Sequence, residues 1–328
     1  FFAVRLSRGH SGVIMNTPSA SDLRGEVIRP ARRRLSLTMR QRNILTSYLF
    51  LTPFYLLFVT FVVVPFVWGL ALSFANGGIL SAPEFAGLDN YARLLKDFRV
   101  RIVLVNSLRY VLTIVPSTLV LGMCFALLIN HRWTRWPGIF RAIIFFPILA
   151  SGAAVAQIWG YILLPRYGIL SYFLTLLGLP DIKWLTDPNA APFAVTILTV
   201  WAGVGFQTIV LSAALKGIPQ ELIDAARIDG ADGLGLFFRI ILPLIQPVML
   251  FLVVIGTIGA FQIFDTVYVL TQGGPQYSTQ TIVGMIYGFA FQSYDSEGLA
   301  AALGVILFLI IMPISLIQMR VLRTNVEY

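Results

Sequence analysis

The sequence predicts an all-α polytopic membrane protein with about six transmembrane helices. Of its 328 residues, 57% are hydrophobic and 12% are charged, whereas a soluble domain carries about 25% charged residues. Its mean hydropathy is +0.81. The apolar residues form several long runs, and about 20 such residues are needed to cross roughly 30 Å of hydrocarbon. These observations exclude a soluble globular protein.

Six runs have this length and contain no Asp, Glu, Lys or Arg. We therefore expect membrane spans at residues 48–74, 110–129, 142–164, 192–215, 240–264 and 299–319. Two further apolar stretches do not qualify as spans. The stretch 168–179 is too short, and the stretch 279–294 is diluted by polar residues and glycine. We interpret both as interfacial segments on the outer side.

Residues 1–47 are polar and rich in arginine, which indicates a mobile cytoplasmic extension; a nucleic-acid-binding or lipid-binding tail is the alternative. This tail lacks an apolar core followed by a small-residue cleavage site, so we expect no removable signal peptide. Short cytoplasmic loops carry an excess of Lys and Arg. If the tail is inside, the inner segments also contain Arg132, Arg135, Arg141, Lys216, Arg227, Arg239, Arg320 and Arg323. We therefore expect both termini in the cytoplasm.

A charged segment, residues 221–232, lies between the fourth and fifth apolar runs. Pro219 suits the first turn of a helix, and Glu221 is favoured near a helix N-terminus by the helix dipole. Gly230 can adopt the left-handed conformation that closes a helix, and Asp232 can cap a second one. We predict two helices separated by a glycine break on the cytoplasmic side, with an ordinary solvated turn as the alternative.

This segment resembles the EAA loop of the membrane subunits of bacterial ATP-binding-cassette importers, in particular the sugar-uptake group that includes maltose and glycerol-3-phosphate permeases. In that family, E-A-A is followed three residues later by G-A, and further on by I-x-L-P. This chain has Asp224-Ala225-Ala226, Gly230-Ala231 and Ile240-Ile241-Leu242-Pro243. It departs from the family at Asp224, which keeps the charge of the usual glutamate and has a shorter reach.

Four further stretches carry the resemblance, which covers the chain from about residue 48 to residue 321. They are Gly87-Leu-Asp89-Asn90-Tyr91, similar to G-L-x-N-[YF]; Arg141 with Pro147, similar to R-x-x-x-x-x-P; Trp201 with Gly205-Phe206, similar to W-x-x-x-G-F; and residues 261–275, similar to F-x-x-F-D-x-x-Y-x-L-T-x-G-G-P. At Gln207 the family often has Asn. The order and spacing of these stretches make the resemblance specific.

The resemblance implies the transmembrane domain of a type I ABC importer over residues 48–322, with a cytoplasmic coupling loop at 216–243 and a short cytoplasmic C-terminus at 323–328. It implies a bacterial inner-membrane location and four kinds of partner: a second homologous permease subunit, two cytoplasmic ATPase subunits, an extracytoplasmic solute-binding protein and a carbohydrate substrate. The residues implied in ATPase coupling are Glu221, Asp224, Ala225, Ala226, Asp229, Gly230 and Ala231. The candidates for the substrate path are Trp201, Phe206, Gln207, Phe261, Gln262, Asp265 and Tyr268.

The chain itself lacks the residues for catalysis or metal binding. A phosphate-binding Walker loop needs Gly-Lys-Ser/Thr, whereas Lys96, Lys183 and Lys216 follow Leu, Ile and Leu. Two histidines, His10 and His131, make no cluster for a metal site. We therefore expect no catalytic residue, metal or cofactor in this chain, and we expect ATP and Mg²⁺ to bind in the partner subunits.

Three alternatives to a sugar importer were open at the level of the sequence. An importer for glycerol-3-phosphate or a polyol would share these motifs. A secondary transporter driven by an ion gradient usually needs ionisable groups within its spans, whereas here Arg109 and Asp265 lie only at the outer margins of the predicted spans. A scaffold without a transport role is supported by no feature of the sequence.

Overall fold

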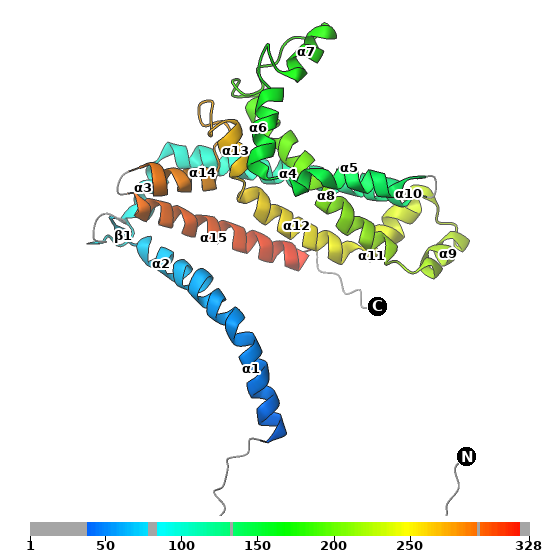
Figure 1. The fold of residues 1–328 in the computed structure, drawn as a ribbon, viewed down its shortest axis with the longest axis horizontal. Coiled ribbons are helices and arrows are strands. Elements are labelled where there is room, and N and C mark those ends of the chain that lie inside the picture. Colours follow the sequence, from blue (N-terminus) through cyan, green and yellow to red (C-terminus); the bar gives the residue numbers. More distant parts are fainter. Residues whose placement is uncertain (1–37, 78–83, 132–133, 294–295, 322–328) are drawn as a thin grey trace, which may run out of the picture. The chain divides into compact units, whose positions relative to one another are not determined.

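A computed structural model of the chain describes residues 38–77, 84–131, 134–293 and 296–321 (Figure 1). The predicted basic tail therefore lies mostly outside the described residues, as does the C-terminal segment 323–328. The chain divides into two units, residues 1–60 and residues 61–328, and each is described by itself. Helices make up nearly all of the regular structure, so the predicted all-α fold is confirmed.

The first unit contains α1 (Met39–Phe58), which begins earlier than the predicted span at residue 48. Thr38 caps this helix. The Thr38 amide donates to Gln41 Oε1 at 3.0 Å, and the Gln41 amide donates to Thr38 Oγ1 at 3.3 Å. This reciprocal arrangement satisfies two backbone donors that would otherwise lack partners, so it fixes where the helix starts. Residues 39–47, assigned to the tail from the sequence, are helical.

The second unit holds the remaining elements. In chain order, after the π-helix η1 (Val59–Val63) at its boundary, they are α2 (Val64–Leu72), β1 (Ala75–Asn76), β2 (Glu84–Phe85), α3 (Asp89–Lys96), α4 (Phe98–Asn130), α5 (Pro137–Leu149), α6 (Gly152–Ile162), α7 (Ile169–Leu176), α8 (Ala191–Lys216), α9 (Gln220–Ile228), α10 (Gly233–Leu236), the π-helix η2 (Phe237–Ile241), α11 (Leu242–Leu244), α12 (Gln246–Phe261), α13 (Asp265–Leu270), α14 (Ile282–Tyr287), the π-helix η3 (Gly288–Gln292) and α15 (Glu297–Val321). The two short strands pair in antiparallel fashion.

Helix α4 is the centre of the second unit and lies alongside α8 in the same direction. Near one end, the Arg109 guanidinium carbon lies 5.1 Å from the centre of the Phe193 ring. Near the other end, Asn130 Nδ2 donates to the Ser212 carbonyl and Ser212 Oγ donates to Asn130 Oδ1. A parallel pair requires the chain to cross back between them, which agrees with the predicted alternation of spans.

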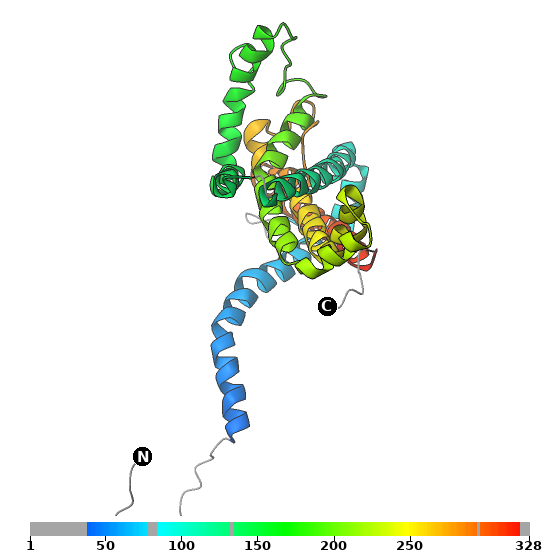
Figure 2. The same cartoon turned by 90° about the vertical axis from the view of Figure 1, so that its right-hand side faces the viewer.

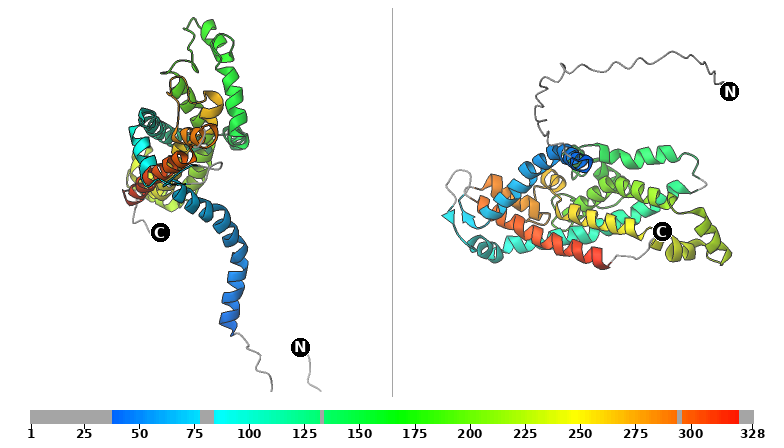
Figure 3. Two further views of the ribbon diagram at one scale, coloured as in Figure 1. Left: turned by 90° about the vertical axis from the view of Figure 1, so that its left-hand side faces the viewer. Right: turned by 90° about the horizontal axis from the view of Figure 1, so that it is seen from below.

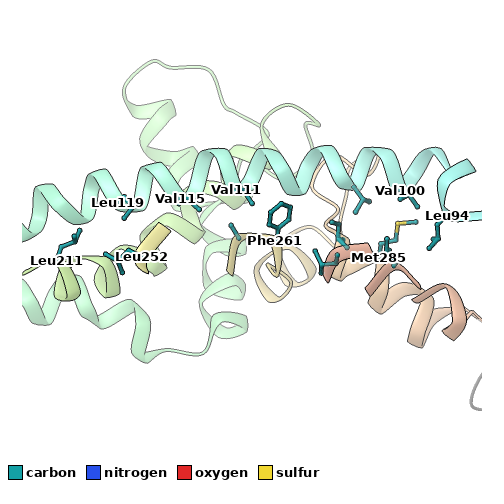
Figure 4. Close-up of a cluster of buried hydrophobic side chains, with 14 of the residues drawn as sticks. Leu94, Val100, Val111, Val115, Leu119, Leu211, Leu252, Phe261 and Met285 are labelled. Atoms are coloured by element: carbon teal, nitrogen blue, oxygen red, sulfur yellow. The ribbon is translucent and has the colours of Figure 1, made fainter. Parts of the chain in front are cut away.

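Helices α12 and α14 also pack against α4, and α15 packs against α12 and α14. The main hydrophobic core lies between them and includes Val111, Val115, Leu252, Phe261 and Met285 (Figure 4). Helix α12 runs antiparallel to α15, and Gln318 Nε2 of α15 donates to Thr257 Oγ1 of α12 at 2.9 Å (Figure 1). Seen from below, α15, α12 and α8 lie side by side (Figure 3). A single core thus holds the helices that follow α4.

The motif Gly87-Leu-Asp89-Asn90-Tyr91 serves as a clamp at one end of this bundle. Asn90 Nδ2 donates to the carbonyl oxygens of Ser73 and Ala75, at 3.2 and 2.8 Å, and Tyr91 donates its hydroxyl hydrogen to Ser73 Oγ at 2.7 Å. These bonds satisfy backbone carbonyls just beyond the end of α2, where the helix offers them no partner. The motif therefore has a structural role.

Two of the predicted spans are not straight helices. Helices Pro137–Leu149 and Gly152–Ile162 meet at 99°, and Gly233–Leu244 and Gln246–Phe261 meet at 71°. In the first pair the backbone is extended at Ala150 and Ser151, and α6 with α7 projects away from the bundle (Figure 2). In the second pair Pro247 has no N–H to continue the helix, so α12 starts anew at Gln246.

Within the described residues, four helices are long and apolar enough to cross a membrane, or six if each bent pair forms one span. This range includes the predicted number. The stretch 279–294, interpreted from the sequence as interfacial, contains α14 and η3. Ile282 and Met285 of α14 are buried in the main core against α4 and α15. This stretch is therefore part of the bundle and not a segment on its surface.

Gly205 permits α5 and α8 to approach closely, which gives a direct test of this packing. A Cβ at Gly205 would lie 2.5 Å from the Ile144 carbonyl oxygen, whereas a Cβ at Gly203 would meet Thr118 Cγ2 at 3.7 Å. We expect Gly205→Ala to destabilise the protein by about 1–3 kcal/mol through overpacking. Gly203→Ala, on the same helix, should be neutral or stabilising by up to ~1 kcal/mol. Thermal unfolding of both purified variants in detergent compares them, and equal unfolding temperatures would contradict the packing described.

Candidate functional site

The charged segment forms helix α9 with a well-defined end. Pro219 occupies the N-cap position, and the helix ends at Ile228. Gly230 has φ +86°, its amide donates to the Arg227 carbonyl, and the Ala231 amide donates to the Ala226 carbonyl at 2.9 Å. This pair of bonds is the Schellman arrangement, which satisfies carbonyls at a helix end and requires a left-handed residue. The helix and glycine break predicted from the sequence are therefore confirmed.

Asp224 lies on the solvent side of α9, and the hydrogen-bond partners of its carboxylate among the described residues come from the same helix. Gln220 Nε2 donates to Asp224 Oδ1 at 3.0 Å, and Arg227 Nη1 donates to the same oxygen at 3.4 Å. Both members of the Asp224–Arg227 ion pair are more than half exposed, and such pairs contribute little to stability. The carboxylate is thus positioned by its neighbours and still accessible to a partner.

The other residues predicted for this site differ in exposure. Glu221, Ala225, Asp229 and Gly230 are exposed, Ala231 is half-buried and Ala226 is buried. Large apolar residues are exposed beside them: Ile228 is 87% exposed and Leu234 is 76% exposed. Apolar side chains and charges on one accessible surface are typical of the place where another protein docks. Asp232 occupies the N-cap position of α10, as predicted, without the side-chain hydrogen bond of a cap.

Behind this surface, α10 and η2 connect α9 to the core. Leu236 is buried, and Phe237 packs against the main core cluster. Ile245, at the bend before α12, is also buried in that cluster. Packed side chains thus link the segment that follows α9 to the main core.

The candidates for the substrate path are not gathered in one place. Trp201 of α8 lies against Trp159 of α6, with ring centres 5.5 Å apart. Phe206, also on α8, is partly exposed. Phe261 is 2% exposed and belongs to the main core (Figure 4). Gln262 caps the end of α12 and is exposed. The structure thus leaves Trp201, Phe206 and Gln262 accessible, and it buries Phe261.

Asp265 and Tyr268 lie on α13, beyond the end of α12. Asp265 is exposed in the first turn of α13 and faces Gly152 at the start of α6. Tyr268 is 37% exposed and lines a cavity together with Phe264 and Tyr287. Phe264 and Tyr287 were not predicted as site residues. Phe264 lies within the F-x-x-F-D motif, but its contact with Tyr287 depends on how the chain between them folds.

Gln207 is the unusual polar residue of the bundle, since it is 7% exposed at the junction of three helices. A Cβ at Gly122 of α4 would lie 2.7 Å from Gln207 Cβ, and one at Gly256 of α12 would lie 3.9 Å from Gln207 Nε2. Gln207 Oε1 has no hydrogen-bond partner within the described part of the chain. A buried acceptor without a partner costs about 1–3 kcal/mol.

Within the described ranges, no group of three or more His, Cys, Asp and Glu side chains could hold a metal ion.

Comparisons with known proteins agree with this arrangement. Residues 43–325 match the family described as binding-protein-dependent transport system inner membrane component. The trehalose/maltose transport system permease protein MalF of Thermococcus litoralis is 31% identical over 88% of this chain and 97% of its own length. The lactose transport system permease protein LacF of Rhizobium radiobacter is 31% identical over 83% of this chain and 92% of its own length.

The fold also matches a solved structure. The chain superimposes with a TM-score of 0.77 on a chain of the crystal structure of a bacterial ABC transporter involved in the import of the acidic polysaccharide alginate. The match covers 87% of this chain and 98% of that chain, at 24% identity. At this identity the likeness is one of fold.

Gln207 offers a test that separates packing from polarity. We expect Gln207→Leu, which keeps the volume and removes the unpaired acceptor, to be as stable as the wild type or more stable. Gln207→Ala should lose about 2 kcal/mol, because it leaves a cavity beside Gly122 and Gly256. Thermal unfolding of the two purified variants measures the difference. A Leu variant as unstable as the Ala variant would show that the amide does have a partner.

Proposed function

This chain belongs to the family of binding-protein-dependent transport system inner membrane components, and on that premise we propose that it forms the path of an ATP-driven importer for a mono- or oligosaccharide. The relatives named for trehalose and maltose and for lactose support a carbohydrate as the substrate. Glycerol-3-phosphate or a polyol is the nearest alternative. The family is described as binding-protein-dependent. This description, together with predicted spans that contain no Asp, Glu, Lys or Arg, argues against transport driven by an ion gradient alone.

The observation that carries the proposal is the exposed helix α9 with its closing glycine. It presents Asp224, the acid of the EAA-like motif, on the same surface as Ile228, and it is connected to the core through Leu236 and Phe237. We assign Glu221, Asp224, Ala225, Ala226, Asp229, Gly230 and Ala231 to the contact with a cytoplasmic ATPase. Buried Ala226 supports the helix from behind, and the exposed residues would meet the ATPase.

The complete importer in this proposal contains a second homologous permease subunit, two cytoplasmic ATPase subunits and an extracytoplasmic solute-binding protein. ATP and Mg²⁺ bind in the ATPases. The excess of Lys and Arg on inner loops supports the placement of α9 and both termini in the cytoplasm. In transport, a displacement of α9 shifts the helices around the path between two packed arrangements. Trp201, Phe206, Gln207, Phe261, Gln262, Asp265 and Tyr268 are assigned to that path.

Charge reversal at Asp224 tests the coupling assignment. We expect Asp224→Lys to abolish co-purification of ATPase activity and ATP-dependent uptake, because the proposed contact of this carboxylate with the ATPase would be replaced by a like or unpaired charge. The variant should still reach the membrane, since Asp224 is exposed and its hydrogen-bond partners among the described residues lie within α9. The measurement is a pull-down in mild detergent with an ATPase assay of the eluate.

The matched control is Glu84→Lys, which reverses an exposed carboxylate on β2. It should co-purify the ATPase like the wild type. Normal ATPase recovery with Asp224→Lys would reject the contact, and loss of the ATPase in both variants would show a general effect of charge.

The backbone at Gly230 provides an independent test. Gly230→Pro removes the N–H that bonds to Arg227 and cannot adopt φ +86°. We expect this variant to lose uptake by at least about tenfold, equivalent to ~1.4 kcal/mol of coupling. Gly230→Asn should keep most of the uptake, because Asn tolerates the left-handed conformation better than other residues. Equal uptake by the two variants would remove Gly230 from the coupling assignment.

A further inference from the structure

A small cavity lies between α13, α14 and η3, outside the residues assigned to ATPase coupling. Its volume is about 160 Å³, smaller than the roughly 300 Å³ at which pockets for drug-sized ligands begin. Its lining contains three aromatic rings and three amide side chains, from Phe264, Tyr268, Tyr287, Gln272, Gln280 and Gln292. A cavity of this size suits a single ring of a polar ligand.

The three rings form one packed cluster. The ring centres of Phe264 and Tyr268 are 5.1 Å apart with an angle of 24° between the planes, so these rings are stacked. Tyr287 lies 5.0 Å from Phe264 and 5.1 Å from Tyr268. Rings that support one another in this way have little freedom to move, and they offer a large rigid surface to a ligand at low entropic cost.

The polar part of the lining is neutral. The glutamine amides each provide two donors and an acceptor, and within the described part of the chain the lining contains no charged side chain. Arg99, a basic residue that lines a neighbouring cavity, donates to both carboxylate oxygens of Asp97, and this contact holds the pKa of Asp97 below its ordinary value. Because the charge of Arg99 is already paired, the site favours a neutral ligand over a phosphate or a sugar acid.

The cavity is held in shape by the loop that joins α13 to α14. Thr279 Oγ1 donates to the Gly274 carbonyl at 2.7 Å, and Thr281 Oγ1 donates to the Ile263 carbonyl at 2.9 Å. From α4, Asn106 Nδ2 donates to the carbonyl oxygens of Tyr277 and Gln280, at 2.8 and 3.1 Å. Hydrogen bonds from side chains to the backbone of this loop, two of them from Asn106 of the central helix α4, make a preformed site.

Two glycines make room for one of the amides. The side chain of Gln280 lies against Gly273 and Gly284, where a Cβ would contact Gln280 Oε1. Gly273 also has φ +83°, which favours glycine. The sequence around the cavity thus fits the placement of the Gln280 amide in its wall.

The cavity lies at the end of α4 opposite to α9. Tyr110 of α4 donates its hydroxyl hydrogen to the Thr279 carbonyl beside the cavity, and Asn130 bonds to Ser212 near the start of α9. Asn130 lies 20 positions after Tyr110 in α4. This separation corresponds to about 30 Å of helix, close to the thickness of the hydrocarbon core. If α9 is cytoplasmic, as proposed, the cavity opens on the outer side.

We propose that this cavity binds one ring of a neutral carbohydrate at the outer mouth of the path, as a site separate from Phe261 in the core. The proposal rests on the proposed import function. The sugar ring lies against Tyr268 or Tyr287, and its hydroxyl groups bond to Gln272, Gln280 and Gln292. Glycerol-3-phosphate, which has no ring and carries a charge, is not bound here.

Direct binding tests the proposal. The intact permease and ATPase complex, without the solute-binding protein, is placed in lipid nanodiscs free of maltoside detergent, and saturation-transfer NMR measures the Kd of maltose, trehalose, lactose and glycerol-3-phosphate. We expect at least one of the three sugars to bind and glycerol-3-phosphate not to bind. Tyr287→Leu should weaken sugar binding about tenfold, whereas Tyr287→Phe should stay within about threefold of the wild type.

Two further variants control for folding and for unspecific aromatic contacts. Gln292→Leu changes an exposed amide without touching the ring cluster, and it should also weaken binding several-fold. Tyr172→Leu removes a ring that is 64% exposed on α7, outside the cavity, and should bind like the wild type. Each variant is checked for complex assembly by size-exclusion chromatography.

The outcomes separate this inference from the import function. The carbohydrate site would be overturned if Tyr287→Leu and Gln292→Leu both bound sugar like the wild type, or if Tyr172→Leu lost as much sugar binding as they do. It would also be overturned if glycerol-3-phosphate alone bound, or if no sugar bound. Uptake of the labelled sugars by cells carrying the whole transport system is measured in parallel, and it supports or rejects the import function whichever result the binding gives.

Discussion

The close parallel packing of α4 against α8 is the contact on which the arrangement of the second unit depends. Gly122 of α4 allows this approach, because a Cβ there would lie 2.7 Å from Gln207 Cβ of α8. Gly205 of α8 does the same for α5, where a Cβ would collide with the Ile144 carbonyl oxygen. In a bilayer there is no hydrophobic driving force between helices, so small residues that permit such approach largely decide which helices pair. Helix α12 then packs against both α4 and α8, and Gln207 lies where the three helices meet.

The sequence predicted the helices well because hydrophobic length and local capping are both local properties. The end of α9 at Gly230 needs only a residue that tolerates φ +86°, and such a residue is visible in the chain. The bends were not predicted, because hydropathy measures how apolar a run is and says nothing about its direction. Ser151-Gly152 and Pro247 are turn or helix-breaking residues inside apolar runs. The prediction of spans rested on the length of those runs and gave these residues no weight.

The outer cavity was out of reach of the sequence for a different reason. Phe264 lies just before α13 and Tyr287 ends α14. Their contact depends on a loop in which Gln272, Gln276 and Tyr277 all have positive φ. Such conformations are uncommon for residues other than glycine and are maintained by the surrounding hydrogen bonds. In the structure, the residues of the motif F-x-x-F-D-x-x-Y also lie in two different places. Phe261 ends α12 inside the core, and the chain then turns, so that Phe264 and Tyr268 stack outside it.

The bent helix from α10 to α12 is what joins the two candidate sites. It begins beside α9, passes the buried bend at Ile245 and ends at Gln262, a few residues before the aromatic cluster. Gln207 meets it midway, at Gly256, with an acceptor that has no partner in the described residues. Packed interiors change between discrete arrangements more readily than they deform. If an ATPase displaces α9, we expect α12 to shift with it, because the bend at Ile245 packs in the same core as Phe237 of η2. Such a shift would move the end of α12 against the outer cavity, and would couple a cytoplasmic event to a change at the opposite side of the bundle.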